Sequence, residues 1–165
     1  MRHTNIVNEK DLEWNGQKTG NRFESKRKSL SSAAGGERLG CSLYEVPPGK
    51  TAWPYHYHLS NEEAIFILSG CGTLRIDGGE EPVSGGDYVS LPAGKTPHQL
   101  INDSDDLLRY ICFSTMIEPD VTVHPDSGKI GVFAGSAPGG PKEKRTLQKY
   151  FKSSSETDYW DGEET

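Results

Sequence analysis

Short apolar runs alternate with glycine- and proline-rich turns between residues 40 and 115, and this punctuation limits the fold more than any other feature of the chain. No part of the region keeps a helical period over ten or more residues. Glycine supplies positive φ in tight turns and proline fixes φ at about −65°, so each cluster ends one strand and reverses the chain. Many short strands separated by such turns are typical of an all-β sandwich or barrel.

The strands expected in this region are residues 41–46, 52–58, 63–68, 72–76, 88–91, 98–101 and 107–114. Two more are expected at 116–123 and 130–134. Leu147, Tyr150 and Phe151 fall at i, i+3 and i+4, which predicts a short amphipathic helix within 142–152. We divide the chain into an N-terminal arm (1–40), a β-barrel (41–134) and a C-terminal extension (135–165), with both ends polar and irregular.

Composition argues against several classes of partner. The 165 residues include 18 Lys and Arg against 24 Asp and Glu, and a net charge of −6 opposes binding to phosphate backbones. We expect no nucleic-acid partner. The N-terminus lacks an apolar signal segment and the longest apolar run is only 64–68, so we expect no membrane association and a cytoplasmic location. Three scattered cysteines suggest neither a disulfide framework nor a thiolate cluster.

Two histidines and a carboxylate stand close together at the centre of the predicted barrel. On a strand, His56 and His58 point to the same side, which with a nearby glutamate suggests a metal site. The alternating residues Trp53, Tyr55 and Tyr57 then form an outward aromatic row. Because an exposed row of this kind needs a cover, we expect the arm, the tail or a second copy in a homodimer to lie on it.

A third histidine follows in a second patterned stretch. The run Gly86-Asp-Tyr-Val-Ser-Leu-Pro-Ala-Gly94 contains a sharp turn, and His98 opens the next strand after it. With His56 and His58, it supplies three imidazoles to the same predicted barrel.

These two stretches resemble the paired motifs of the cupin superfamily, G-x5-H-x-H-x3-4-E-x6-G and G-x5-P-x-G-x2-H-x3-N. The first motif corresponds to Gly49, His56, His58, Glu63 and Gly70, and the second to Gly86, Pro92, Gly94, His98 and Asn102. One extra residue follows Gly49 and another follows Gly94, both in turns, where insertions are tolerated. More loosely, the chain is similar to small single-domain cupins of type 2 without an assigned reaction.

The resemblance implies a double-stranded β-helix, or jelly-roll, barrel with a metal held by His56, His58, Glu63 and His98. Strand periodicity does not separate Glu62 from Glu63, but the family spacing from Gly70 favours Glu63. Three imidazoles and a carboxylate suit one divalent transition metal: Mn, Fe, Ni, Co, Cu or Zn.

The implied partner is a small oxygen-rich molecule that binds at the metal. Isomerisation or epimerisation and non-haem oxygenation remain open as reactions, and the alternative is a non-catalytic binding or sensor barrel. No acid or base is assigned. Tyr88 would qualify only if it pointed inward, and His124, beside Pro125, is expected on the surface of a turn.

Overall fold

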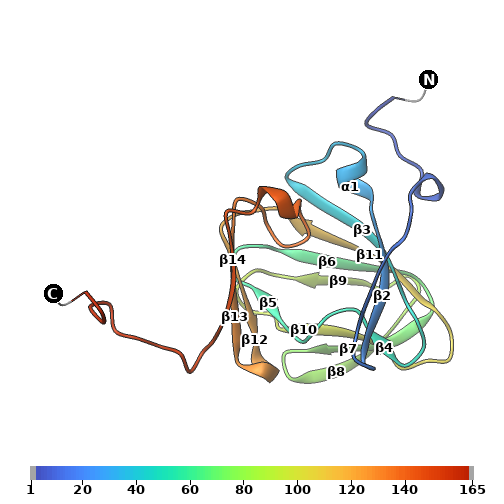
Figure 1. The fold of residues 1–165 in the computed structure, drawn as a ribbon. Helices are drawn as coiled ribbons and strands as arrows, with labels where there is room; N and C mark the ends of the chain where they lie inside the picture. The colour runs from blue at the N-terminus through green and yellow to red at the C-terminus, as the bar shows by residue number, and fades with distance from the viewer. Residues whose placement is uncertain (1–2, 164–165) are drawn as a thin grey trace.

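The computed structural model describes residues 3–163 and is built almost entirely from β-strands in two sheets (Figure 1). In spatial order the large sheet contains β8 (Gly79–Ser84), β7 (Cys71–Ile76), β10 (His98–Asn102), β4 (Lys50–Thr51), β2 (Phe23–Ser29), β3 (Leu39–Val46), β11 (Leu108–Thr115), β6 (Glu63–Ser69) and β9 (Tyr88–Leu91), with β1 (Asn15–Thr19) paired to β2. The second sheet contains β14 (Leu147–Lys152), β13 (Lys129–Ala134), β12 (Asp120–His124) and β5 (Tyr57–His58).

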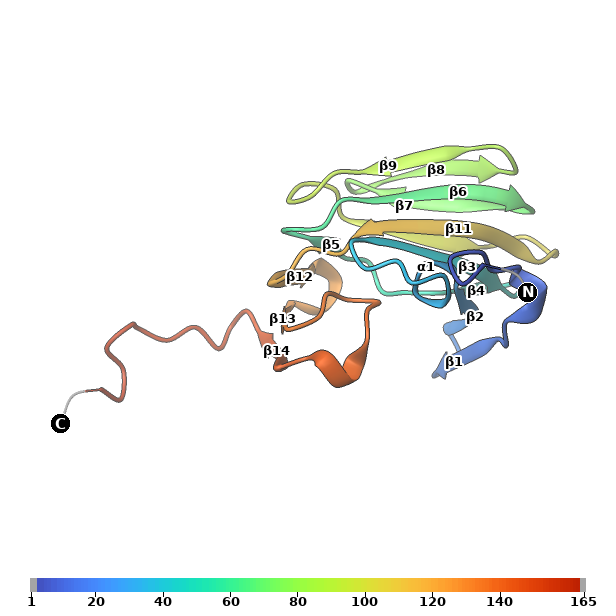
Figure 2. The same cartoon turned by 90° about the horizontal axis from the view of Figure 1, so that it is seen from above.

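The large sheet curls on itself, and the second sheet stands beside one end of it (Figures 1 and 2). Helical structure among the described residues is limited to α1 (Leu30–Ala33), η1 (Glu9–Asp11), η2 (Pro125–Ser127) and η3 (Lys142–Lys144). The predicted all-β barrel is therefore confirmed as the fold class. No helix in residues 3–163 is long and apolar enough to cross a membrane.

The core lies inside the curl of the large sheet. Strand β11 pairs with β3 on one side and β6 on the other, so its inward side chains are enclosed by both neighbours. Ile67 and Leu108 are fully buried there. The core cluster consists of Tyr44, Val46, Ala52, Ile65, Ile67, Leu74, Val83, Leu91, Leu100, Leu108 and Tyr110. This packing fixes β6, whose first residue is Glu63.

The N-terminal segment is not the irregular arm that the sequence predicts. β2 runs antiparallel to β3, and Phe23 also pairs with Thr51 of β4, so β2 is an integral strand of the large sheet. The sequence does not predict this strand because β2 contains several charged residues. Lys28 is only 6% exposed, because its ammonium binds Glu9 and lies 4.5 Å from the centre of the Trp14 ring.

The predicted C-terminal helix is also wrong, because residues 147–152 form strand β14 along β13. The same spacing of Leu147, Tyr150 and Phe151 fits a strand with Leu147 and Phe151 on one face and Tyr150 on the other. Tyr150 stands edge-on to the Phe133 ring of β13. Cross-strand packing, which sequence periodicity does not contain, decides between the two structures.

Two details of the barrel also differ from expectation. The strand expected at 52–58 is interrupted, and only β4 and β5 remain as short strands on either side of Pro54. A proline cannot donate to a sheet ladder, so the chain bends there. Strand β8 was missed because residues 79–84 carry one aliphatic residue, Val83, and also contain Pro82.

The expected outward aromatic row does not form, because strand alternation fails at the same bend. Tyr55 is only 5% exposed, and its hydroxyl accepts a hydrogen bond from the Gly78 N–H. The Arg75 guanidinium lies 3.8 Å from the centre of its ring. Tyr57 lies on strand β5 as expected. Trp53 precedes the bend, and its ring stands edge-on to that of Tyr44.

Candidate metal centre

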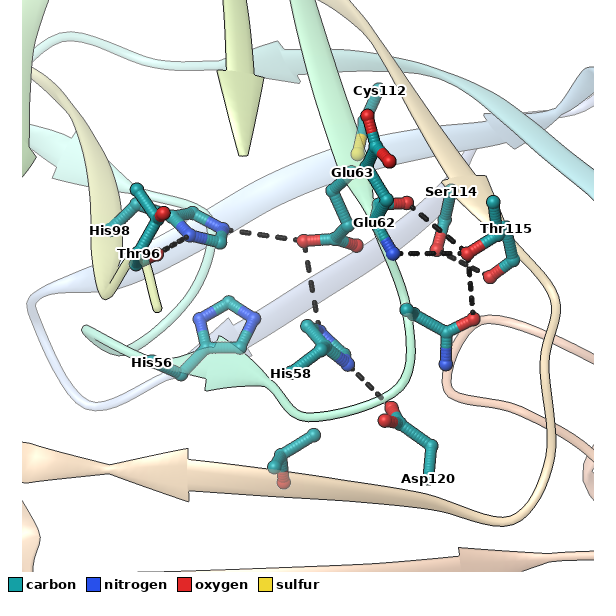
Figure 3. Close-up of polar contacts among 12 residues, drawn as sticks. His56, His58, Glu62, Glu63, Thr96, His98, Cys112, Ser114, Thr115 and Asp120 are labelled. Atoms are coloured by element: carbon teal, nitrogen blue, oxygen red, sulfur yellow. Dashed lines mark hydrogen bonds and ion pairs between the residues drawn. The ribbon is translucent and has the colours of Figure 1, made fainter. Parts of the chain in front are cut away.

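His56, Glu63 and His98 converge so closely that one potential ligand atom from each lies within 4.8 Å of the others (Figure 3). His56 and His98 lie directly opposite each other, because their backbones exchange two hydrogen bonds of 3.1 and 2.9 Å. Glu63 opens β6 and His98 opens β10. Segments far apart in sequence thus bring the three side chains together.

The second sheet adds His58 to this group. The Nε2 atom of His58 lies 3.7 Å from the Glu63 carboxylate, and Nε2 of His98 lies 3.3 Å from the same oxygen. His58 is on β5, opposite Thr122 of β12. His58 therefore lies beside His56, Glu63 and His98 where the two sheets meet, although it is not one of the three residues whose potential ligand atoms all lie within 4.8 Å of one another (Figure 3).

Hydrogen bonds at Nδ1 determine which nitrogen of each ring is free. His56 Nδ1 lies 2.8 Å from the Pro54 carbonyl oxygen and His98 Nδ1 lies 2.9 Å from the Thr96 carbonyl oxygen. A carbonyl oxygen only accepts, so both Nδ1 atoms carry the proton and the neutral rings present the Nε2 lone pair.

An imidazole lone pair and a carboxylate oxygen that face each other repel unless a cation lies between them. The Nε2 atom of neutral His98 and the Glu63 oxygen are both acceptors at 3.3 Å. A metal ion, or a proton in its absence, removes the conflict. The orientation of imidazole rings by partners at the far nitrogen is the usual arrangement at metal sites, so these residues fit a metal ion.

The electrostatics of His56 and Glu63 favour the forms that can bind a metal. Burial and the neighbouring His98 lower the pKa of His56 to about 3, so its ring is neutral near neutral pH. Burial acts to raise the pKa of Glu63, but the hydrogen bond that His98 donates when it is protonated, together with the charges of the nearby imidazoles, outweighs it and lowers the pKa to about 2. A neutral imidazole and an ionised carboxylate are the forms that bind metals.

Asp120 is a site residue that our sequence analysis missed. Its carboxylate is fully buried, and Oδ2 accepts a 2.6 Å hydrogen bond from His58 Nδ1 while Oδ1 accepts one from the Ser60 N–H. Burial acts most strongly and would raise the pKa of Asp120, but the hydrogen bond and charge of His58, with hydrogen bonds from Asn61 and Ser60, together outweigh it and lower the pKa. The signal was available: in Asp-Val-Thr-Val-His, residues 120–124, the polar residues alternate with valines and so share one face.

Replacing Asp120 by Asn is expected to weaken divalent-metal binding by about 10–100-fold, the usual cost of losing an outer partner of a metal-binding histidine. The amide keeps one oxygen for Ser60, but turning its NH2 toward His58 opposes donor to donor. Isothermal titration with Mn²⁺ or Zn²⁺ measures the change. Asp126→Asn is the matched control, because that carboxylate is exposed and binds Arg75 instead. Equal affinity in the Asp120 variant and the wild type would contradict this role.

Glu62 and Glu63 are clearly separated in space. Glu62 is exposed, and its N–H bonds to the Thr115 hydroxyl, while the Glu63 carboxylate points at the histidines (Figure 3). Cys112 also faces this region (Figure 3). Burial, with the Glu63 charge nearby, raises the pKa of its thiol well above the usual range, so it is neutral and not a thiolate ligand.

Two other residues weighed as functional candidates take different places from those expected. Tyr88 is 64% exposed on β9, outside the barrel, so it does not line the centre. His124 is not on the surface: it is 9% exposed, and its ring lies nearly parallel to that of His56, with centres 5.7 Å apart. It belongs to the face of β12 that carries Asp120.

The chain is thus a small, curled β-barrel protein with a His/Glu cluster that could hold a metal ion. Residues 42–114 match the family model described as "Cupin domain", so this part of the chain is similar to that family.

One curated relative, quercetin 2,3-dioxygenase from Bacillus subtilis, is 36% identical over 83 residues, which is 48% of this chain. The matched part spans only 24% of that dioxygenase. A sugar phosphate isomerase of the cupin superfamily from Silicibacter pomeroyi superposes with a TM-score of 0.78 at 20% identity, covering 94% of this chain and 98% of that one. A predicted oxalate decarboxylase from Thermotoga maritima covers 68% of this chain and 99% of its own, with a TM-score of 0.58 and 19% identity. Both structural likenesses concern the fold.

Proposed function

We propose that the protein holds one divalent transition metal through His56, His58, Glu63 and His98, and acts there on a small oxygen-rich molecule. The observation that supports the proposal is the convergence of His56, Glu63 and His98, with Nε2 of His58 3.7 Å from the Glu63 carboxylate. Nδ1 of each imidazole is bonded to an oxygen that accepts its proton. Four protein ligands leave one or two positions open on a metal that prefers five or six. Candidate metals are Mn, Fe, Ni, Co, Cu and Zn.

When bound, the metal supplies Lewis acidity that polarises hydroxyl, carbonyl or carboxylate groups of the small molecule. Glu63 contributes the negative charge that offsets the cation. Asp120 fixes the ring of His58, and the carbonyls of Pro54 and Thr96 fix the other two rings, so the donor atoms need little rearrangement. The chain thereby provides a preorganised and largely buried polar site.

Two reaction classes fit this site: isomerisation or epimerisation of a carbohydrate-like substrate, and non-haem oxygenation. The superposition on a sugar phosphate isomerase motivates the first and the sequence relationship to a quercetin dioxygenase motivates the second. A non-catalytic binding or sensor barrel is the alternative. Further, we propose a cytoplasmic location, supported by three free cysteines, and a homodimeric state.

Elemental analysis of untagged protein tests the proposal, with about one divalent transition metal ion expected per chain. A chelator should remove the metal, and adding it back should restore thermal stability, since ligands that bind only the folded state stabilise it. Iron or copper with oxygen uptake would favour oxygenation, and manganese or zinc without it would favour isomerisation. Protein that stays metal-free after incubation with each candidate metal would overturn the metal-dependent function.

A further inference from the structure

The second sheet has two chemically different faces. On β12, Asp120, Thr122 and His124 are buried toward the candidate metal centre, whereas Val121 and Val123 are only partly buried. Because side chains alternate along a strand, the two valines lie on the opposite, outer face.

Apolar side chains continue over this outer face from one edge of the sheet to the other. Tyr57 lies opposite Val123, and Val123 lies opposite Ile130. Ile130 in turn lies opposite Phe151 of β14. With the second cross-strand pair of Val121 and Val132, the apolar residues of the outer face include Tyr57, Val121, Val123, Ile130, Val132 and Phe151. Lys149, opposite Val132, lies on the same face.

No element formed by residues 3–163 is drawn over this face in Figure 1, where the second sheet forms the left margin of the body. Phe151 remains 51% exposed. After Lys152 the chain leaves the body instead of folding back over the sheet (Figures 1 and 2). Tyr159 and Trp160 are 83% and 62% exposed in that tail. A contiguous apolar face and two exposed aromatics mark an interaction surface.

Charge links the tail to the strand beside it. Residues 142–152 carry five cations and one carboxylate, whereas residues 153–163 carry four carboxylates and no cation. The tail of one copy is therefore complementary to the β14 region of another. Such complementarity guides and orients association.

The estimated contact area is also consistent with an interface between two copies of the chain. Four strands with 19 residues in all give the sheet face a footprint on the order of 300 Å². Tyr and Trp side chains bury about 150–250 Å² each, so one tail adds roughly 300–500 Å². Together these approach the ~800 Å² per partner of a stable interface, which the sheet face alone does not reach.

We propose that the outer face of the second sheet joins two copies of this chain about a two-fold axis, with Tyr159 and Trp160 of each tail packed against the β14 region of the other copy. The same patch then serves both subunits, as a two-fold interface requires. The surface is independent of the reaction proposed for the metal centre. It nevertheless supports that centre, because Tyr57 and Val121 of the interface are the chain neighbours of His58 and Asp120.

Sedimentation velocity of the full chain tests this interface, and wild type at about 10 μM should sediment as two copies of the 18.2-kDa chain. Phe151→Lys should raise the dimer dissociation constant by about 30-fold or more, the effect of losing a central aromatic anchor. A Tyr159→Ala, Trp160→Ala double variant should weaken the dimer in the same direction. Leu68→Lys is the matched control, because Leu68 is a 40% exposed apolar residue on β6 of the large sheet.

Circular dichroism of each variant shows whether it is folded, which is expected because all the substituted side chains are exposed. A monomeric wild type, including one in which the tail covers its own sheet, would overturn the proposal. So would a dimer that Leu68→Lys disrupts and Phe151→Lys leaves intact, since the large sheet would then be the interface.

Discussion

A Glu63→Gln variant is expected to lose divalent-metal affinity by roughly 100-fold or more, because changing even an outer partner of a metal ligand costs about 10–100-fold. Gln has nearly the same shape as Glu but no charge, so the substitution tests the anion and not the packing. In the wild type the Glu63 carboxylate lies within 4 Å of the Nε2 atoms of His58 and His98. Metal content after purification and titration calorimetry both measure the loss.

Glu62→Gln provides the control for this experiment. It makes the same chemical change one residue earlier, on an exposed side chain that points away from the histidines. Its metal affinity should equal that of the wild type. Full metal retention in Glu63→Gln together with loss in Glu62→Gln would reverse the assignment of the carboxylate ligand.

The strands of the barrel were predictable because turn chemistry is local. The run 63–68 was expected as a strand and β6 covers Glu63–Ser69, and the strand expected at 88–91 is β9. Gly70, with φ of +82°, separates β6 from β7. At such positions the residue type alone reports the backbone conformation.

The errors arose where a contact distant in sequence decides the structure. Residues 147–152 fit a helical period equally well, and only pairing with β13 makes them a strand. β2 reads as a charged lead-in because its burial depends on Glu9 and Trp14, which cover Lys28 from outside the sheet. Local propensity is overridden in both segments by packing that a single sequence does not show.

The residues of the candidate site also fall into those that the sequence predicts and one that depends on a contact distant in sequence. His56, His58, Glu63 and His98 were predictable because each stands at a fixed spacing from a glycine or proline turn. For Asp120 the sequence indicates only a polar face of a strand, because the residue is 62 positions from His58 and reaches it only through the β5–β12 pairing. The chain thus places the proposed ligands in two short motifs and the residues that would support them in the topology of the second sheet.

Gly70→Ala is expected to destabilise the fold by about 2–5 kcal/mol, the sum of about 1–2 kcal/mol for a left-handed backbone and about 1–3 kcal/mol for overpacking. A Cβ at Gly70 would lie 2.5 Å from the Leu107 carbonyl oxygen and 3.0 Å from Leu108 Cα. Both are backbone atoms, so no side chain can rotate away. The midpoint of urea unfolding measures the loss.

Gly78→Ala separates the two contributions to this cost. Gly78 has nearly the same φ, +81°, but no neighbouring atom lies within 4 Å of its added Cβ. It should therefore lose only the backbone part, about 1–2 kcal/mol. Equal losses in the two variants would show that the approach of Gly70 to Leu107 adds nothing. A larger loss at Gly70 would show that glycine is required there for close packing of β6 on the segment entering β11, and β6 is the strand that begins at Glu63.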